Sequence, residues 1–197
     1  MLSLFHLFTF VFMLLTVPAV PEPKASSIST VFRPGHSIEE TEDYIPWYGS
    51  RRLDWEDFRC EPKRNSDAVA LTSTALGISY KMGNHGLSYE ITCSFSKVKS
   101  WGLLKTSYIL AHEQGHFDIT EIFARKLHRE LLKYKFSRRT FRQDVNLIYD
   151  RVVKEKEAFQ EAYDGQTDHS RNKKLQQEWL ERIDRILEDT APYANYP

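Results

Sequence analysis

The chain has 197 residues, of which 41% are hydrophobic, and this suits one folded domain with additional segments. Its 27 basic and 27 acidic residues balance, so no overall field favours binding to nucleic acid or to an anionic membrane. Only two cysteines are present, without Cys-x-x-Cys spacing, which disfavours a cysteine-based metal site or thiol chemistry.

The first segment, Met1 to Val17, is almost wholly apolar. This run is shorter than the about 20 residues that span a bilayer, and it ends at a small-residue cleavage site, Val17-Pro18-Ala19. The pattern is typical of a secretory signal peptide over residues 1–19. Because no basic residue precedes Lys24, an uncleaved anchor is the alternative. Either form predicts that the remaining chain is exported, to a secreted, periplasmic or cell-envelope location.

Export affects the interpretation of the two cysteines. Cys60 and Cys93 are the only pair, and an oxidising compartment favours a disulfide between them. The alternative is that Cys93 is a small buried hydrophobic residue.

Residues 20–50 are predicted to be a linker or arm, because they contain several prolines and a serine cluster and have no sustained periodicity. The folded domain is expected over residues 51–190. It opens with Leu53–Phe58, in which Trp55 and Phe58 are candidate core residues.

Apolar and polar residues alternate on both sides of the turn Gly83–Gly86. The apolar positions are Leu76, Ile78 and Tyr80 before the turn and Leu87, Tyr89, Ile91, Cys93 and Phe95 after it. Period-two alternation around a turn that contains Asn and Gly predicts an antiparallel hairpin with one buried face.

Helices are predicted after the hairpin. Apolar residues recur at helical spacing, without proline, between Thr106 and Lys135. A second helix is expected to begin at Ser137 as N-cap and to end at Gly165, and a third to cover about residues 171–189. Strands followed by three helices predict an α+β fold with a small antiparallel sheet.

The first predicted helix carries His112-Glu113-Gln114-Gly115-His116. Residues four apart lie one above the other on a helix, with Cβ atoms about 5–6 Å apart. His112 and His116 can therefore bind one Zn²⁺, while Glu113 beside them acts as a general base. The alternative is an amphipathic helix with two incidental histidines. The position of the motif in mid-helix favours a metal site.

A catalytic zinc site needs a third protein ligand and an open position for water. At about 100° per residue, Glu121 and His128 point away from the two histidines and are expected on the solvated surface, with Glu121 paired to Arg125. The third ligand must then come from another segment. The candidates are His169, in the loop after the second helix, and Glu157 or Glu161 on that helix. Asp164 or Asp168 could instead orient a ligand histidine.

The segment His112–Ile119 resembles domain-of-unknown-function family 922, which comprises secreted bacterial proteins regarded as zinc proteases of the zincin type. Leu53–Phe58, Ser100-Trp101 and Tyr163-Asp164, followed by Thr167 and His169, also fit its pattern. The resemblance extends over about residues 51–182, although Ser170 stands where the family often has Gly. It implies a zincin-like domain in which His169 completes the metal site.

The resulting hypothesis is an exported zinc-dependent peptidase with one Zn²⁺ per chain and a peptide or polypeptide substrate. His112, His116 and His169 hold the metal, Glu113 takes a proton from water, and Tyr163 helps to stabilise the oxyanion. An edge strand of the hairpin is expected to hold the substrate in extended form. The alternatives are a non-catalytic exported zinc-binding or cell-envelope interaction domain, and an amidase that acts on cell-wall peptide bonds.

Overall fold

The computed structural model describes residues 39–62, 66–83 and 86–197. The expected signal peptide and most of the expected arm lie outside the described residues. Among the residues that are described, no helix is both long and apolar enough to cross a membrane.

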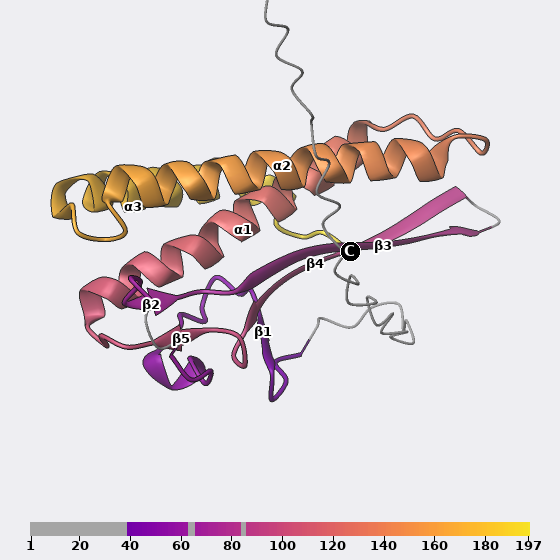
Figure 1. Cartoon of the computed structure of the whole chain (residues 1–197). Coiled ribbons are helices and arrows are strands. Elements are labelled where there is room, and N and C mark those ends of the chain that lie inside the picture. Colours follow the sequence, from indigo (N-terminus) through magenta and orange to yellow (C-terminus); the bar gives the residue numbers. More distant parts are fainter. Residues whose placement is uncertain (1–38, 63–65, 84–85) are drawn as a thin grey trace, which may run out of the picture. The chain divides into compact units, whose positions relative to one another are not determined.

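A three-stranded antiparallel sheet forms one layer of the domain (Figure 1). The central strand β4 (Gly86–Ser96) pairs on one side with β3 (Thr74–Gly83) and on the other with the short β1 (Tyr44–Pro46). The register of β3 and β4 runs from Thr74 opposite Phe95 to Gly83 opposite Gly86, which confirms the predicted hairpin.

Strand β1 corrects the prediction that residues 20–50 are only a linker. Ile45 lies opposite Phe95 on β4, and both side chains are fully buried. A three-residue strand that ends in proline is too short to carry a period-two pattern, so the sequence pattern could not reveal this strand.

A second, two-stranded sheet joins β2 (Ala70–Leu71) to β5 (Trp101–Gly102). The ring of Trp55, in the 3₁₀ turn η1 (Trp55–Asp57), packs directly on Gly102, where a Cβ atom would come within 2.4 Å of the ring. Trp101 itself is buried.

The described residues form three α-helices, α1 (Ser107–Lys133), α2 (Phe141–Thr167) and α3 (Lys173–Asp189), so the fold is α+β as predicted. Thr106 caps α1 by accepting a hydrogen bond from the backbone N–H of Ile109. Two predicted boundaries are wrong. Ser137 belongs to a turn before α2, and the helix passes through Gly165 and ends where Asp168 adopts a left-handed conformation.

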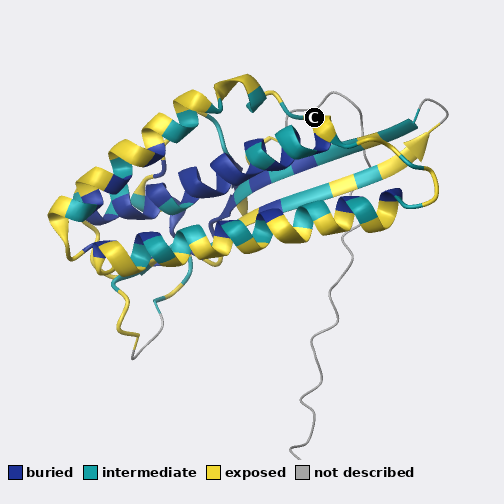
Figure 2. Ribbon diagram, turned by 90° about the horizontal axis from the view of Figure 1, so that it is seen from above, coloured by how far each residue is buried: buried dark blue, intermediate teal, exposed yellow. Residues whose placement is uncertain are grey.

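Helix α1 lies between the sheet and the pair formed by α2 and α3 (Figure 1). Figure 2 shows that α1 is buried along most of its length, whereas α2 and α3 expose their outer faces. A helix with neighbours on both sides has no solvated face. Polar residues of α1 are therefore buried on two sides of the helix, against the sheet on one side and against α2 and α3 on the other.

The face of α1 opposite the histidine pair is therefore buried, which corrects the expectation for Glu121 and His128. Glu121 is 1% exposed, pairs with Arg125 at 2.8 Å as expected, and also accepts a hydrogen bond from the Tyr196 hydroxyl at 2.6 Å. His128 packs edge-on against Tyr89 and Tyr196. Strand β4 and the segment that follows the 3₁₀ turn η2 (Ala191–Tyr193) cover this face.

The expected disulfide is not formed, because Cys60 and Cys93 are both free. Cys93 lies on β4 in the core, where burial raises the pKa of its thiol well above the usual range. Cys60 lies after η1, where its N–H donates to the carbonyl of Ser100. The alternative interpretation of Cys93, as a buried hydrophobic residue, is the one that the structure supports.

Candidate metal centre

Two imidazoles and one carboxylate converge between α1 and α2. The Nε2 atoms of His112 and His116 each lie 3.1 Å from Oδ1 of Asp164. One ligand atom from each of the three residues lies within 4.8 Å of the others. The two histidines lie on adjacent turns of α1, and Asp164 lies in the last turn of α2. The packing of these two helices therefore brings the three side chains together.

The three side chains are coupled electrostatically. Burial alone would raise the pKa of Asp164, but hydrogen bonds and charge from His112 and His116 hold it well below its usual range. Burial disfavours the protonated form of His116. The hydrogen bond and negative charge of Asp164, and then the negative charge of Glu113, favour that form more strongly, so the pKa of His116 is raised. The site therefore attracts positive charge in its interior.

Gln160, one turn before Asp164 on α2, orients His116. Its Nε2 donates to the backbone carbonyl of His116 at 3.0 Å, which assigns the other end of the amide as the oxygen. That oxygen makes a close hydrogen bond with Nδ1 of His116, so Nδ1 carries a proton and Nε2, which faces Asp164, is the nitrogen that could bind a metal once it is deprotonated. Gln160 was not among the residues predicted from the sequence, although its spacing of four from Asp164 places both on one face of α2.

His112 is oriented by stacking instead. The ring of Tyr163 lies parallel to the imidazole at 4.5 Å, and its hydroxyl donates to the carbonyl of His112 at 3.3 Å. Tyr163 is fully buried, and this burial raises the pKa of its hydroxyl. Its hydroxyl also lies against Gly115, where a Cβ atom would be only 2.6 Å away. Tyr163 thus supports α1 from behind and does not line the cavity, in contrast to the position expected for an oxyanion donor.

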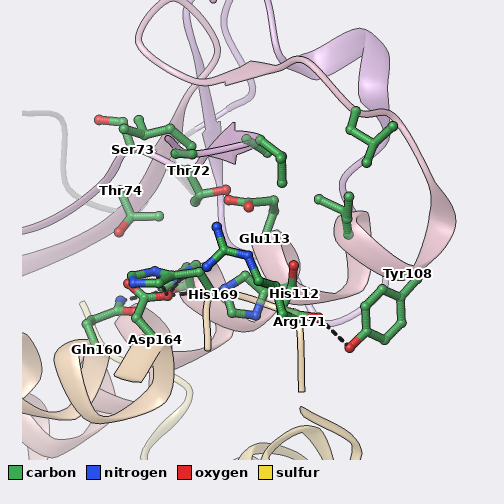
Figure 3. A pocket seen from close by; sticks show the side chains of 18 of the residues that line it. Thr72, Ser73, Thr74, Tyr108, His112, Glu113, Gln160, Asp164, His169 and Arg171 are labelled. Carbon is green, nitrogen blue, oxygen red and sulfur yellow. Dashed lines mark hydrogen bonds and ion pairs between the residues drawn. The ribbon is translucent and has the colours of Figure 1, made fainter. Parts of the chain in front are cut away.

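The group opens onto a cavity of about 1230 Å³. Its walls are the segment Asp67–Thr74, the first turns of α1, and the region from Lys156 on α2 to Lys173 at the start of α3. Glu113 points into the cavity in Figure 3. Its carboxylate has no hydrogen bond or salt bridge with any described residue. It is therefore a base that no cation neutralises by direct contact.

His169 lies beside the group but is not part of it. Its Nδ1 is 3.9 Å from Oδ1 of Asp164, and its side chain is 67% exposed at the cavity wall. The residue sits in a run of three left-handed, non-glycine residues, Asp168, His169 and Ser170, with φ angles of 49°, 48° and 71°. Such residues cost on the order of 1 kcal/mol each and persist only where neighbours fix them. Here the backbone N–H of His169 donates to the backbone carbonyl of Asp164, and the hydroxyl of Tyr108 donates to the backbone carbonyl of Ser170.

The remaining candidates lie apart from the three converging side chains. Asp168 is exposed and pairs with Arg171 at 3.4 Å, so it orients no histidine. Glu157 lines the cavity and contacts Lys156 at 2.9 Å, and Glu161 is exposed. Asp164, expected as an orienting residue, instead supplies the third converging atom.

The donor set fits a divalent metal ion. Zn²⁺ binds imidazole nitrogen and carboxylate oxygen at about 2.0–2.2 Å, and tetrahedral ligands at such lengths are separated by roughly 3.3–3.5 Å. The two 3.1 Å separations are close to this value. Protonated histidines held by one carboxylate would occupy the same places, so the geometry defines a possible metal site without identifying the ion.

Comparison with curated proteins and with solved structures finds no match. A family model does match the greater part of the chain, from residue 37 to residue 170, including the histidine pair, Asp164 and His169. The family is described as "Bacterial protein of unknown function (DUF922)". The chain therefore belongs to the DUF922 family.

Proposed function

We propose that the protein is a zinc-dependent hydrolase that cleaves peptide bonds. The observation that carries this proposal is the convergence of His112, His116 and Asp164 next to the unpaired carboxylate of Glu113, at the wall of a large cavity. A site that only stabilised the fold would need neither an acid–base residue nor an accessible cavity beside it.

In this proposal His112, His116 and Asp164 hold the metal, because theirs are the atoms that already face one point. A bound Zn²⁺ supplies a Lewis acid that lowers the pKa of water toward about 7 and polarises a carbonyl group. Glu113 accepts the proton of a water molecule as its oxygen attacks the peptide carbon, and returns the proton to the departing amine. His169, exposed at the cavity wall, replaces Tyr163 as the candidate donor to the oxyanion.

The cavity wall suggests how an extended peptide would be held. In antiparallel pairing both backbone polar groups of a residue point to the same side, and residues alternate. The carbonyl of Val69 accepts from the N–H of Leu103, just after β5. The N–H of Ser73 donates to the hydroxyl of Ser100, and its carbonyl accepts from the N–H of Ser96 at the end of β4. Ala70 and Thr72 therefore present their backbone groups to the cavity. A substrate strand would add at this edge, rather than along the hairpin as the sequence suggested.

The test is metal content together with cleavage of a peptide library by purified protein. Glu113→Gln should keep about one zinc per chain and lose cleavage, because the ligands remain and the base is removed. Asp164→Ala should lose most of the zinc. Asp168→Ala is the matched control, since this exposed carboxylate pairs only with Arg171 and should change neither quantity. An active Glu113→Gln enzyme would refute the mechanism.

The second candidate is a structural metal site, and the proximity of His169 to Asp164 favours it. Structural zinc sites are closed by four protein ligands, and His169 is the side chain available to close this one. His169→Ala separates the two candidates. It should retain zinc and lower the rate of cleavage if His169 acts on the substrate, whereas it should lose zinc, with no activity to lose, if the site is structural.

A further inference from the structure

Exposed leucines gather where β2 and β5 lead into α1. Leu71, Leu103 and Leu104 are 38%, 66% and 52% exposed. The backbone N–H of Leu104 donates to the carbonyl of Val69 at 3.1 Å, which holds Leu104 beside β2. Leu71 and Leu104 line the cavity, together with Tyr108 and Ile109 from the first turn of α1. We call these four residues the apolar patch.

The apolar patch adjoins the proposed base. Ile109 and Glu113 are four apart on α1, so they lie one turn from each other on the same face. In Figure 3 Glu113 lies between Tyr108, at the apolar end, and Gln160, at the other end. The side toward Gln160 is polar, because Ser73, Thr74 and Asp164 lie there in Figure 3. A peptide in the cavity would thus meet an apolar surface on one side of the bond next to Glu113 and a polar one on the other.

Other exposed apolar side chains are unrelated to the cavity. Leu132, near the end of α1, and Leu147, on α2, are 61% and 60% exposed, and neither lines it. Single surface leucines of this kind are common, whereas a contiguous patch at a cavity is characteristic of a binding surface. The apolar patch also has a charged margin. The Nζ atom of Lys173 lies 5.7 Å from the centre of the Tyr108 ring, and Arg171 lines the same cavity.

We propose that the apolar patch is the subsite for a bulky apolar side chain directly adjacent to the cleaved bond, and that Lys173 favours an acidic residue beyond it. This assignment rests on the proposed peptidase function and gives it a substrate class: extended peptides with Leu, Phe or Met at the cleaved bond and Asp or Glu as its neighbour on the side away from that bond. The apolar side chain covers Leu71 and Leu104, and the acidic one meets the cationic margin.

Cleavage of a mixed peptide library by the zinc-loaded full chain, read by mass spectrometry, tests the subsite. Leu, Phe and Met should be enriched at one position next to the cut by at least about tenfold over Gly and Ser, as apolar pockets discriminate. Leu104→Ser should remove most of this preference. Leu103→Ser, next to it but outside the cavity, and Leu147→Ser, on α2, are the matched controls and should keep it. Lys173→Glu should reverse the preference for the acidic neighbour.

Binding separates this inference from the proposed function. Fluorescent peptides of equal length that carry Leu-Glu or Gly-Glu are titrated into zinc-loaded Glu113→Gln protein, and anisotropy is measured. Preferential, Leu104-dependent binding of the Leu peptide would support the subsite even if the wild type cleaves nothing, and would then overturn only the peptidase proposal. Cleavage with no apolar preference, a preference unchanged by Leu104→Ser, or equal binding of both peptides would overturn the subsite.

Discussion

Gly115 lies between the two histidines, in the middle of α1, and its replacement by alanine tests how tightly Tyr163 supports the site. In a solvated helix the change would stabilise the protein by about 0.5–1 kcal/mol, because glycine loses more backbone entropy on folding. Here the added Cβ would meet the Tyr163 hydroxyl at 2.6 Å and two ring carbons at 3.0 and 3.1 Å. Tyr163 is fully buried, and its ring packs against His112, His116 and Trp179.

Overpacking of this kind costs about 1–3 kcal/mol. Gly165 on α2 is the matched control, because it is also helical and a Cβ atom there would meet nothing within 4 Å. The intrinsic helix gain is similar in both variants, so it cancels in the comparison. Gly115→Ala should therefore be less stable than Gly165→Ala by about 1–3 kcal/mol.

The assay is urea unfolding of the metal-free proteins, with an unchanged slope as the check that both variants unfold in the same way. The double variant Gly115→Ala/Tyr163→Phe removes the closest contact and should regain part of the loss, which gives a favourable coupling energy. Equal stability of Gly115→Ala and Gly165→Ala would show that Tyr163 is not held against the helix, and the account of His112 orientation would then fail.

Three further predictions concern the interior of α1 and its partners. Gln160→Ala should weaken zinc binding by about 10–100-fold, measured by competition with a chelator, whereas Glu161→Ala, one residue away and exposed, should not. In the metal-free protein, stability from the pair of His116 and Asp164 should be present between about pH 4 and pH 6.5. The pKa of His116 is raised, so the contribution of its charge to the free energy of unfolding is lost as pH rises above this window. The pKa of Asp164 is lowered, so the contribution of its charge is lost as pH falls below the window. The difference in stability between wild type and Asp164→Asn should therefore peak within it. A difference that is constant from pH 3 to pH 9 would contradict this. Glu121→Ala should destabilise the protein by about 3–5 kcal/mol in urea unfolding, because it leaves Arg125 buried without its carboxylate, while an exposed carboxylate on α3, Glu188, should tolerate the same change within about 0.5 kcal/mol.

The hairpin and helix α1 could be predicted because both are periodic. Alternating residues from Leu76 to Phe95 specify an antiparallel pair with one buried face, and the structure confirms the pairing. The apolar spacing around His112 specifies a helix, and Thr106 caps it as its chemistry allows. In both cases the signal is local, so no knowledge of the rest of the fold is needed.

The predictions that failed depend on which elements become neighbours. Glu121 was expected in water because it points away from the two histidines, but β4 and Tyr196 cover it. The third converging residue depends on how α2 packs against α1, and sequence spacing does not determine this. Asp164 and His169 are five residues apart, and the left-handed end of α2 between them decides that the carboxylate faces the histidines and the imidazole faces the cavity.

The same left-handed turn also limits how the protein can change in length. The short link between α2 and α3 begins where α2 ends, and it places His169, Arg171 and Lys173 at the cavity wall. Its backbone bonds join Asp164 to His169 and Thr167 to Asn172, so each side chain depends on a fixed count of residues. One inserted or deleted residue would shift all of them, whereas point changes at Leu71 or Leu104 would alter only what they contact. Substrate preference should therefore vary by substitution in the apolar patch, while the link keeps its length.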